Sequence, residues 1–517
     1  MKKSLVFSLY LLSAVSLAGQ EPQIPTRASE DVSGVMAQAY WEVWNDEEQA
    51  RIDKDIDTYR KADATFYVGK VKSGTKVRVE QVSSEFIFGA TAFNWNQLGS
   101  KKANAAYREL FGTLFNRATI PFYWSTFERK PGSARYEETI VDTEHWWTWK
   151  SGYAKGQPHW RRPCTDPIVQ WCNERGVKVH GHPLVWGNRK TYPLWMQFVD
   201  LPANEQSILD TLEFVLPGSA HSRMADSYKN MTPEYVMSIL PTYIQNQEKR
   251  SYDRIRDIMS RYQGRIDSYD VVNESAVDYA KGVQDPAAAM CKSVYGIMFS
   301  DYTYKSIKKA EEYNSAGALL NINDYVVDDR YVAQVKNLLE RGARIDVIGS
   351  QMHLFQPQQC LDIAAGTFNA KDKLVTPDKI RDYFGKLGAL GRPTCLSEIT
   401  ITSAGEDERG EMIQAIITRN LYRVWFSLPS MMGITWWNLV DKCGAGGEPA
   451  MSGLFHRNMT PKTAYYALNQ LINEEWRTKE ELTPDSEGNI SWRGFKGTYN
   501  IIWTDRSGKE QVKQFTL

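Results

Sequence analysis

The chain repeats a strand-then-helix pattern eight times, which limits its possible folds more than any other feature. Short apolar runs alternate with longer segments of helical spacing. This alternation is typical of a (β/α)8 TIM barrel, and also of a doubly wound open sheet. The chain has no GxGxxG after the first strand and no P-loop, so we predict the barrel. The predicted strands are 86–92, 117–122, 177–186, 268–274, 318–324, 346–354, 394–400 and 433–439.

Helical patterns separate these strands, and one more precedes them. The segment 45–62 is densely charged, and Asn45 or Asp46 could cap its first turn. The helices expected between the strands include 103–115, 167–175, 252–262, 302–313, 330–341, 377–390 and 409–427.

Both ends of the chain alternate like β-strands. Residues 64–71 and 75–82 flank a Gly turn and predict a β-hairpin, and residues 491–505 and 509–517 flank a second turn at Ser507-Gly508. Because a two-stranded hairpin is marginal alone, we expect the two ends to form one small β-rich accessory region. Two separate β-decorations are the alternative. The expected division is signal 1–18, accessory region 19–85, barrel 86–476 and accessory region 477–517.

The N-terminus predicts export. Lys2 and Lys3 precede an apolar run at 5–12, and Ser16-Leu17-Ala18 is a small-residue cleavage pattern. These are the parts of a secretory signal peptide. We therefore expect a periplasmic or extracellular protein. No later stretch is apolar enough to predict a membrane span.

Charge and cysteine usage exclude several classes of partner. Lys+Arg and Asp+Glu both number 62, so there is no basic field for nucleic acid and we expect a neutral partner. The six cysteines lack CxxC or Cys/His ligand spacing, so no zinc site is indicated, although one or two disulfides are possible. We expect no metal and no organic cofactor. The 17 Trp and 27 Tyr suit packing and also stacking on uncharged rings.

Polar and aromatic residues gather where the predicted strands end. In a (β/α)8 barrel these carboxyl ends form one face, which carries the active site. We therefore predict that the strand-end residues form a single site. They are His182, Trp186, Asn273, Glu274, Gln351, His353, Glu398 and Trp437, with Asn323 and Asp324 at the end of the fifth strand.

Two carboxylates surrounded by aromatic residues fit glycoside hydrolysis. We predict Glu398 as the nucleophile, with His353 a candidate donor to its ionised form. Glu274 would be the acid/base, its pKa raised by burial and by a negative neighbour. Asn273 could hydrogen-bond a sugar 2-hydroxyl, and Trp186 and Trp437 could stack on or wall the sugar rings.

The motifs carrying these residues resemble glycoside hydrolase family 10, best known for retaining endo-β-1,4-xylanases. The resemblance spans roughly residues 86–476 and implies an acid/base at Glu274 and a nucleophile at Glu398. It also implies a sugar-binding shell made of His182, Trp186, Asn273, Gln351, His353 and Trp437. The matching motifs are HGHPLVW (180–186), YDVVNES (269–275), NINDY (321–325), GSQMHL (349–354), LSEI (396–399), WWNLVD (436–441) and GLFHRNMTPKTAYYAL (453–468).

The chain departs from the family pattern at two places. The family's Thr-Pro-Glu-Asn-x-x-Lys-Trp run after the second strand is replaced by TIPFYW (119–124), where Tyr123 and Trp124 could stack on sugar or belong to the core. The aromatic insertion 144–163 could wall the cleft or form a mini-core, and its Arg161 and Arg162 could contact a uronic acid. The long connection 201–243 could form another rim element.

The predicted function is that of a secreted retaining glycoside hydrolase acting on xylan or a related β-linked polysaccharide. A family-related hydrolase of a different β-glycan is one alternative. A catalytically silent carbohydrate-binding protein is an alternative of another class. Ordinary hydrogen-bonded roles are expected for His145, His221 and His456, and supporting roles for Asp324 and Asp441.

Overall fold

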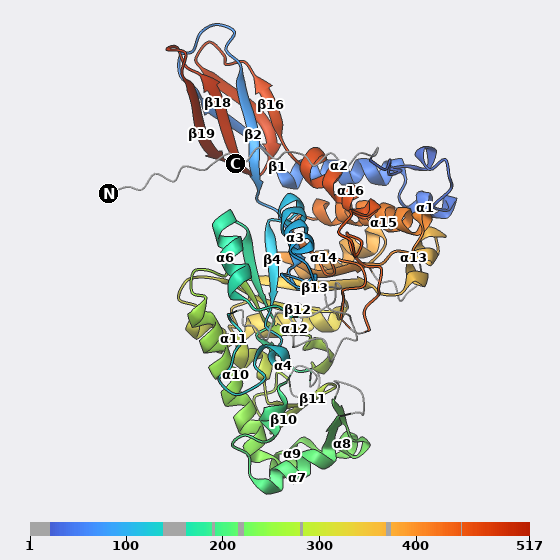
Figure 1. The fold of residues 1–517 in the computed structure, drawn as a ribbon, viewed down its shortest axis with the longest axis vertical. Coiled ribbons are helices and arrows are strands. Elements are labelled where there is room, and N and C mark those ends of the chain that lie inside the picture. Colours follow the sequence, from blue (N-terminus) through green and yellow to red (C-terminus); the bar gives the residue numbers. More distant parts are fainter. Residues whose placement is uncertain are drawn as a thin grey trace.

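A computed structural model describes residues 21–137, 162–188, 192–215, 222–279, 283–368, 374–445 and 447–517 of the chain. The molecule is elongated (Figure 1). A barrel occupies its middle, a β-rich unit built from both ends of the chain lies at one end, and a mainly helical lobe lies at the other.

Eight parallel strands close into the barrel. Each strand pairs with its neighbour in chain order, and the last pairs with the first, so no sheet edge is left. This confirms the predicted (β/α)8 fold. The strands are β3 (Ile87–Thr91), β4 (Arg117–Pro121), β5 (Lys178–His182), β9 (Ser268–Asn273), β12 (Leu319–Asp324), β13 (Val347–Leu354), β14 (Thr394–Ile401) and β15 (Met431–Trp436).

The predicted third strand is divided in two. β5 ends at His182, and the short β6 (Val185–Trp186) follows after Pro183, which lacks the N–H that a sheet ladder needs. Both pieces pair with β9, and β6 places Trp186 beside Asn273. The break therefore brings a predicted site residue next to the end of β9.

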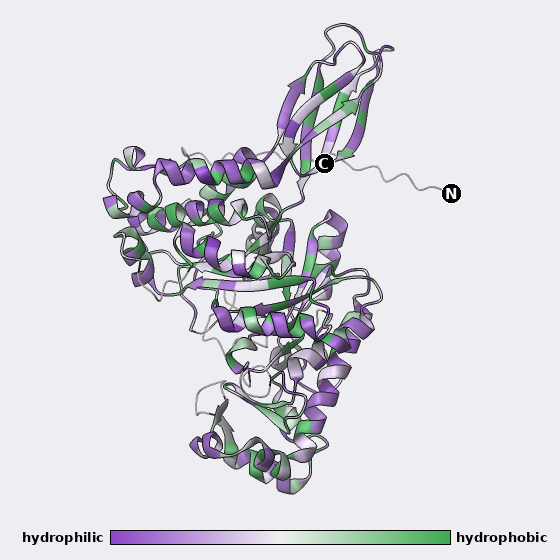
Figure 2. Cartoon of the chain, turned by 180° about the vertical axis from the view of Figure 1, so that it is seen from behind, coloured by the Kyte–Doolittle hydropathy of each residue, from purple (hydrophilic) through white to green (hydrophobic). Residues whose placement is uncertain are grey.

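Amphipathic helices surround the barrel, with apolar and polar residues alternating along them in Figure 2. Their bounds agree with the expected ranges within a few residues, except that α10 begins eleven residues before the expected start at 252. The main ones are α3 (Lys101–Leu114), α6 (Asp166–Arg175), α10 (Pro241–Arg261), α11 (Tyr302–Tyr313), α12 (Asp329–Glu340), α14 (Pro377–Gly388) and α15 (Glu408–Ser427).

The N-terminal helix α2 (Asp46–Arg60) packs on the barrel. Its predicted cap Asn45 accepts a hydrogen bond of 2.9 Å from the backbone N–H of Glu48. Asp53 of α2 pairs with Arg423 of α15, and Ile52 and Ile56 lie in the main apolar core. The helix α16 (Thr463–Asn469) also lies against α15, so α15 is buried along most of its length.

Further short elements decorate the barrel. The predicted rim segment 201–243 contains α7 to α9 and a small strand pair, which with α10 form the lower lobe in Figure 1. They are α1 (Gln38–Val43), α4 (Trp124–Phe127), α7 (Ala203–Leu212), β7 (Glu213–Val215), β8 (Ser222–Met224), α8 (Asp226–Asn230), α9 (Pro233–Ile239), β10 (Met290–Ser293), β11 (Gly296–Phe299) and α13 (Pro357–Ala364).

The β-rich unit combines strands from both ends of the chain in two sheets. β1 (Lys61–Tyr67) pairs with β17 (Asn489–Phe495), and the second sheet has the order β16-β2-β18-β19. Between the sheets lies a separate apolar core that includes Val79, Trp492 and Ile501. The second sheet consists of β16 (Lys479–Leu482), β2 (Val77–Ser84), β18 (Gly497–Thr504) and β19 (Glu510–Thr516).

The predicted N-terminal hairpin is wrong. β1 and β2 lie in different sheets, and each pairs with strands from the C-terminus. Alternation in sequence identifies a strand but not its partner, and the C-terminal strands offered β1 and β2 apolar faces to bury. The C-terminal prediction is confirmed, since β18 and β19 form an antiparallel hairpin.

All six cysteines are buried thiols. Within the described ranges, no helix combines the length and the hydropathy needed to cross a membrane. The predicted signal peptide 1–18 lies outside the described residues.

Candidate active site

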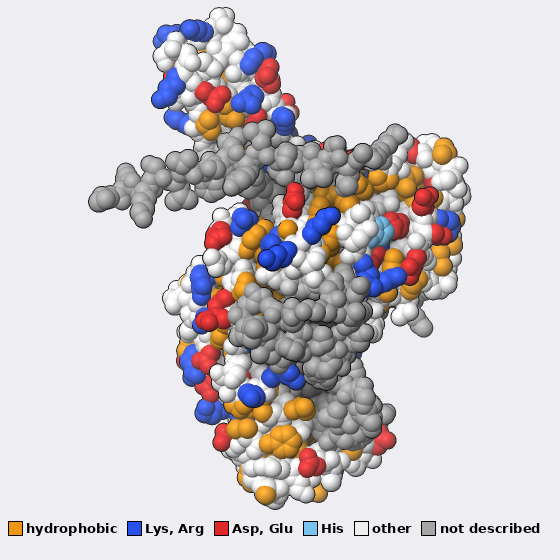
Figure 3. Space-filling model, in the orientation of Figure 1, with side chains coloured by type: hydrophobic (Ala, Val, Ile, Leu, Met, Phe, Trp, Pro, Cys, Tyr) orange, Lys and Arg blue, Asp and Glu red, His pale blue; other side chains and the backbone are white. Residues whose placement is uncertain are grey.

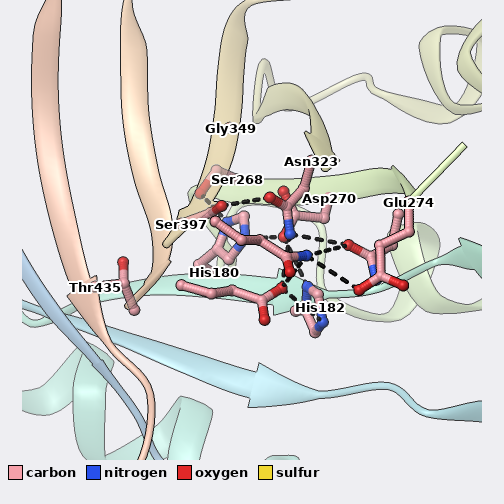
Figure 4. Close-up of polar contacts among 12 residues, drawn as sticks. His180, His182, Ser268, Asp270, Glu274, Asn323, Gly349, Ser397 and Thr435 are labelled. Atoms are coloured by element: carbon pink, nitrogen blue, oxygen red, sulfur yellow. Dashed lines mark hydrogen bonds and ion pairs between the residues drawn. The ribbon is translucent and has the colours of Figure 1, made fainter. Parts of the chain in front are cut away.

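The predicted site residues converge on the face formed by the carboxyl ends of the barrel strands. His182, Trp186 and Asn273 are the last residues of β5, β6 and β9, and Glu274 follows β9 directly. Gln351 and His353 lie in the second half of β13, Glu398 in β14, and Trp437 just after β15. Figure 4 shows the side chains of His182, Asn323 and Glu274 meeting on this face.

One amide nitrogen joins the two carboxylates. Nε2 of Gln351 donates to Oε1 of Glu274 at 3.2 Å and to Oε1 of Glu398 at 3.0 Å. The sum of these distances is the upper limit for the separation of the two oxygens. Two oxygens within this limit are compatible with the ~5–5.5 Å between the carboxyl groups of retaining glycosidases.

Glu398 is buried and surrounded by donors. Asn323 donates to its Oε1 at 2.7 Å, and Nε2 of His353 lies 3.5 Å from its Oε2. Burial lowers the pKa of His353 to about 4, so this imidazole is neutral at neutral pH. The Thr400 hydroxyl lies 2.9 Å from Nδ1 of His353. If that hydroxyl donates, the Nε2–H of His353 faces Glu398.

Asp270 and His182 form a buried chain leading to Glu398. Oδ2 of Asp270 lies 2.7 Å from Nδ1 of His182, whose Nε2 lies 3.6 Å from Oε1 of Glu398. The same oxygen of Asp270 lies 2.9 Å from Nε2 of His180 (Figure 4). Burial would raise the pKa of Asp270, but the two histidines outweigh it and hold this pKa below its ordinary value. An ionised Asp270 therefore orients His182 toward Glu398.

Glu274 accepts hydrogen bonds from three side chains. Nε1 of Trp186 and the hydroxyl of Tyr295 donate to its Oε2 at 3.0 and 3.1 Å, and Gln351 donates to Oε1. Its backbone has φ of 55°, a left-handed conformation that is costly for a non-glycine residue. A hydrogen bond of 2.7 Å from its N–H to the carbonyl of Asn323 supports this turn.

The electrostatics of the pair favour one bound proton. Burial, and after it the charge of Glu398, raise the pKa of Glu274 to about 7. Burial also raises the pKa of Glu398 to about 7, while His182 lowers it in part. Since the charge of Glu398 raises the pKa of Glu274, the proton of the pair is expected on Glu274 and the charge on Glu398.

Aromatic rings form one wall of the site. Trp437 packs edge-on against Phe93 at 5.1 Å between ring centroids and against His182 at 5.5 Å. Tyr123 lies 5.9 Å from Trp186, and the guanidinium of Arg162 lies over the Tyr123 ring at 3.7 Å. Tyr123 thus belongs to the wall of the site.

Trp124, in contrast, belongs to the core. It is buried, donates to Glu128 at 2.8 Å and packs on Tyr192. Arg161 and the other insertion residues before it lie outside the described residues.

One group of side chains has the spacing of a metal site. Ligand atoms of His180, His182 and Asp270 lie within 4.8 Å of one another. Their mutual hydrogen bonds, and that of His180 to Ser268 at 2.8 Å, already use these atoms. We therefore interpret the group as a support for Glu398.

A paired acid and nucleophile beside an aromatic wall can cleave a glycosidic bond. Comparison with known proteins agrees with this chemistry. The model of the glycosyl hydrolase family 10 matches residues 226–471, which include both carboxylates. This part of the chain is thus similar to glycoside hydrolase family 10. The match begins after β5, so the first three strands of the barrel lie outside it.

Curated relatives share modest identity with this chain. Endo-1,4-beta-xylanase C of Paenibacillus barcinonensis is 25% identical over 65% of this chain and 28% of its own length. The anti-sigma-I factor RsgI6 of Acetivibrio thermocellus is 22% identical over 66% of this chain and 34% of its own. The endo-1,4-beta-xylanase 1 of Arabidopsis thaliana is 20% identical over 90% and 38%. The matches thus span 28% to 38% of the length of these three relatives.

A family 10 structure from Paenibacillus barcinonensis has a TM-score of 0.48 and 22% identity, covering 75% of this chain and 95% of the other. Xylanase 10B of Thermotoga petrophila, solved with xylobiose, has a TM-score of 0.48 and 20% identity, covering 76% and 95%.

Sequence reasoning missed several contributors to this site. Asp270 lies inside the YDVVNES motif and His180 begins HGHPLVW, so both motifs carried a signal. Tyr295 comes from the turn between β10 and β11 and had none. Glu448, which accepts from Nε1 of Trp437 at 3.1 Å, lies in a loop and had none either.

The expected supporting residues have structural contacts. Asp324 accepts from the backbone N–H groups of Ala276 and Val326, which fixes the loops after β9 and β12. Asp441 accepts from Gly453 and pairs with Lys462 in the region after β15. His456 lies 3.4 Å from Glu411, whereas His145 and His221 lie outside the described residues.

Proposed function

We propose that this protein is a retaining glycoside hydrolase that cleaves internal β-1,4 linkages of xylan. The sharing of Gln351 by Glu274 and Glu398 carries the proposal, because it brings the two carboxylates as close together as the pair of a retaining enzyme requires. The family 10 match and the xylanases among the relatives support xylan as the first substrate to test. We further propose export through residues 1–18, as the sequence predicts.

The proposed reaction is a double displacement. Glu274 gives its proton to the glycosidic oxygen while a carboxylate oxygen of Glu398 attacks the anomeric carbon. The bond to the leaving sugar breaks, and a glycosyl ester on Glu398 forms. Glu274, now ionised, takes a proton from water, whose oxygen attacks the same carbon and displaces Glu398. Asn323, Gln351 and the histidines stabilise Glu398 as it leaves.

Substitution of each carboxylate tests these roles. Glu398→Ala should abolish release of reducing ends from xylan. Glu274→Ala should slow xylan cleavage by about 10²–10⁴, the usual contribution of a general acid. Aryl glycosides with good leaving groups need no proton, so Glu274→Ala should form their glycosyl intermediate at a nearly normal rate. Equal activity of wild type and Glu398→Ala on xylan would remove the nucleophile assignment.

Stereochemistry tests retention separately. Proton NMR of a fresh digest should show the β-anomer as the first product. An initial α-anomer would mean inversion, and would contradict the proposed geometry.

A different β-glycan is the alternative substrate. The TIPFYW segment motivates a different β-glycan, since an aromatic ring of Tyr123 stands where the family has a polar grip. A panel of decorated xylans and other β-glycans, with products resolved by size, would identify the substrate and distinguish endo from exo action.

A catalytically silent carbohydrate-binding protein is the alternative from another class of function, and the anti-sigma factor among the relatives is not named as an enzyme. Binding to these glycans without any hydrolysis would favour it.

A further inference from the structure

A cavity lies at the opposite end of the barrel from the carboxylates. Its volume is about 580 Å³, and it is lined by residues at the amino-terminal ends of the strands. Pro393 directly precedes β14 and lines the cavity, whereas Glu398 lies in the second half of that strand. Met431 begins β15 and lines the cavity, whereas Trp437 follows the strand. The cavity is therefore a separate site.

Both structural units build this cavity. The barrel supplies the loops before β14 and β15, and the β-rich unit supplies Phe495 and Lys496 at the turn between β17 and β18. The passage from β2 to β3, the end of α2, the start of β5 and the end of α15 complete the lining. Small-molecule sites typically have ~300–1,000 Å³ and often occur between domains.

The charge of the lining is strongly positive. Four cations line the cavity, with Glu85 as their one acidic neighbour in the lining. Lys178 and Arg392 are exposed. Nε of Arg392 donates to the carbonyl of Ile345 at 2.8 Å, which holds its guanidinium in place. The four cations are Arg60, Lys178, Arg392 and Lys496.

Aromatic rings lie among these cations. Phe86, Phe426 and Phe495 line the cavity, and the guanidinium of Arg60 stacks over Phe86 at 4.9 Å. Nε of Arg60 also donates to the carbonyl of Phe426 at 2.6 Å, so this cation is fixed. Fixed cations suit a ligand that carries a carboxylate.

We propose that the cavity is an accessory binding site for a uronic acid unit of a glycan. The preference for an anion rests on the lining charges alone. The choice of a sugar rests on the proposed function, in which an acidic side group of the polysaccharide would be the natural ligand. Binding here would hold substrate on the face opposite the catalytic carboxylates.

Calorimetric titration with glucuronate tests the proposal on the full-length protein. Glucuronate should bind once per chain, and at least tenfold more weakly to the Lys178→Gln/Arg392→Gln variant. The control Lys101→Gln/Lys379→Gln removes two exposed charges at the starts of α3 and α14, and should bind like wild type. Since all four side chains are exposed, both variants should keep the wild-type Tm.

Three outcomes would overturn the proposal. They are no glucuronate binding, binding that the Lys178/Arg392 variant retains, and glucose binding equal to that of glucuronate. Inorganic phosphate that binds as tightly as glucuronate would reduce the site to an anion site and overturn the sugar assignment. If xylan is not hydrolysed but glucuronate binding still needs Lys178 and Arg392, the proposed function fails and the site stands.

Discussion

Glu274 and Glu398 accept hydrogen bonds from one shared amide nitrogen, at 3.2 and 3.0 Å. The amide belongs to Gln351, whose in-register partner across the β13–β14 pair is Glu398. Two carboxylates this close cannot both ionise without a large cost, so they titrate as a pair. The formal net charge of the whole chain is zero, and on the face seen in Figure 3 positive and negative side chains are interspersed. Burial and, after it, the charge of Glu398 raise the pKa of Glu274.

Neutralising Glu398 should lower the pKa of Glu274. The charge of Glu398 is the second cause of the raised value of about 7, after burial. In Glu398→Gln the pKa of Glu274 should fall toward its ordinary value of 4.5 while staying above it, because burial persists. Carbon-13 NMR titration of glutamate-labelled protein measures this. The exposed substitution Glu42→Gln should leave it unchanged, and an unshifted Glu274 in Glu398→Gln would contradict the coupling.

Removing the Tyr295 hydroxyl should shift the pH profile upward. This hydroxyl donates to Glu274 at 3.1 Å and so stabilises its ionised form. In Tyr295→Phe the pKa of Glu274 should rise, and the alkaline limb of kcat/KM should move to higher pH. The control Tyr304→Phe loses a hydroxyl that donates to the carbonyl of Arg341, and it should keep the wild-type limb. A limb moving to lower pH would refute the stated role of Tyr295.

The stability of the fold should depend on the protonation of Glu274. Its folded pKa of about 7 exceeds the ordinary 4.5, so the native state binds more protons between these values. The free energy of unfolding therefore falls as the pH rises from about 4.5 to 7, and this loss of stability persists at higher pH. Glu274→Gln carries no charge and should raise Tm relative to wild type at pH 8 more than at pH 5. A gain of about 1–3 kcal/mol at pH 8 is the expected scale, from ~1.36 kcal/mol per pKa unit.

Asp270→Asn should cost both stability and activity. Asp270 is buried with a lowered pKa, so its contribution is present above its ordinary value of 3.8 and is lost as the pH falls. Breaking a buried charged pair typically costs ~3–5 kcal/mol, which urea unfolding at pH 7 would measure. Released His182 would no longer be oriented toward Glu398, so kcat should fall. The loss of stability should narrow at low pH, and an unchanged difference would contradict the ionised Asp270.

The strand-and-helix repetition was enough to predict the barrel. Each apolar run became a strand because parallel barrel strands are buried on both faces, which leaves a continuous apolar signature. Residues 268–273 are all buried, as this pattern requires. The β-rich unit was harder. Its strands were visible, but β1 pairs with β17 more than four hundred residues away, and nothing local encodes that choice.

The site, like the fold, could be predicted from the sequence only in part. The strand-end rule predicted eight residues that do meet on one face, because the barrel brings all strand ends together. Tyr295 escaped it, since it lies on the turn between β10 and β11 and reaches Glu274 only through tertiary packing. The Asp270–His182 contact was also hidden. Its two residues belong to neighbouring motifs whose mutual orientation depends on the pairing of β5 with β9.

The sequence by itself determined the barrel, the face with the candidate site and the two candidate carboxylates. The reason is that the periodicity of apolar residues and the succession of strands and helices along the chain can be read locally. Only the tertiary structure decided how close these carboxylates lie, which donors surround each, and that the two chain ends close a cationic cavity beneath the barrel. Distances between side chains and the pKa values that depend on them arise from the packing of elements that are remote in sequence.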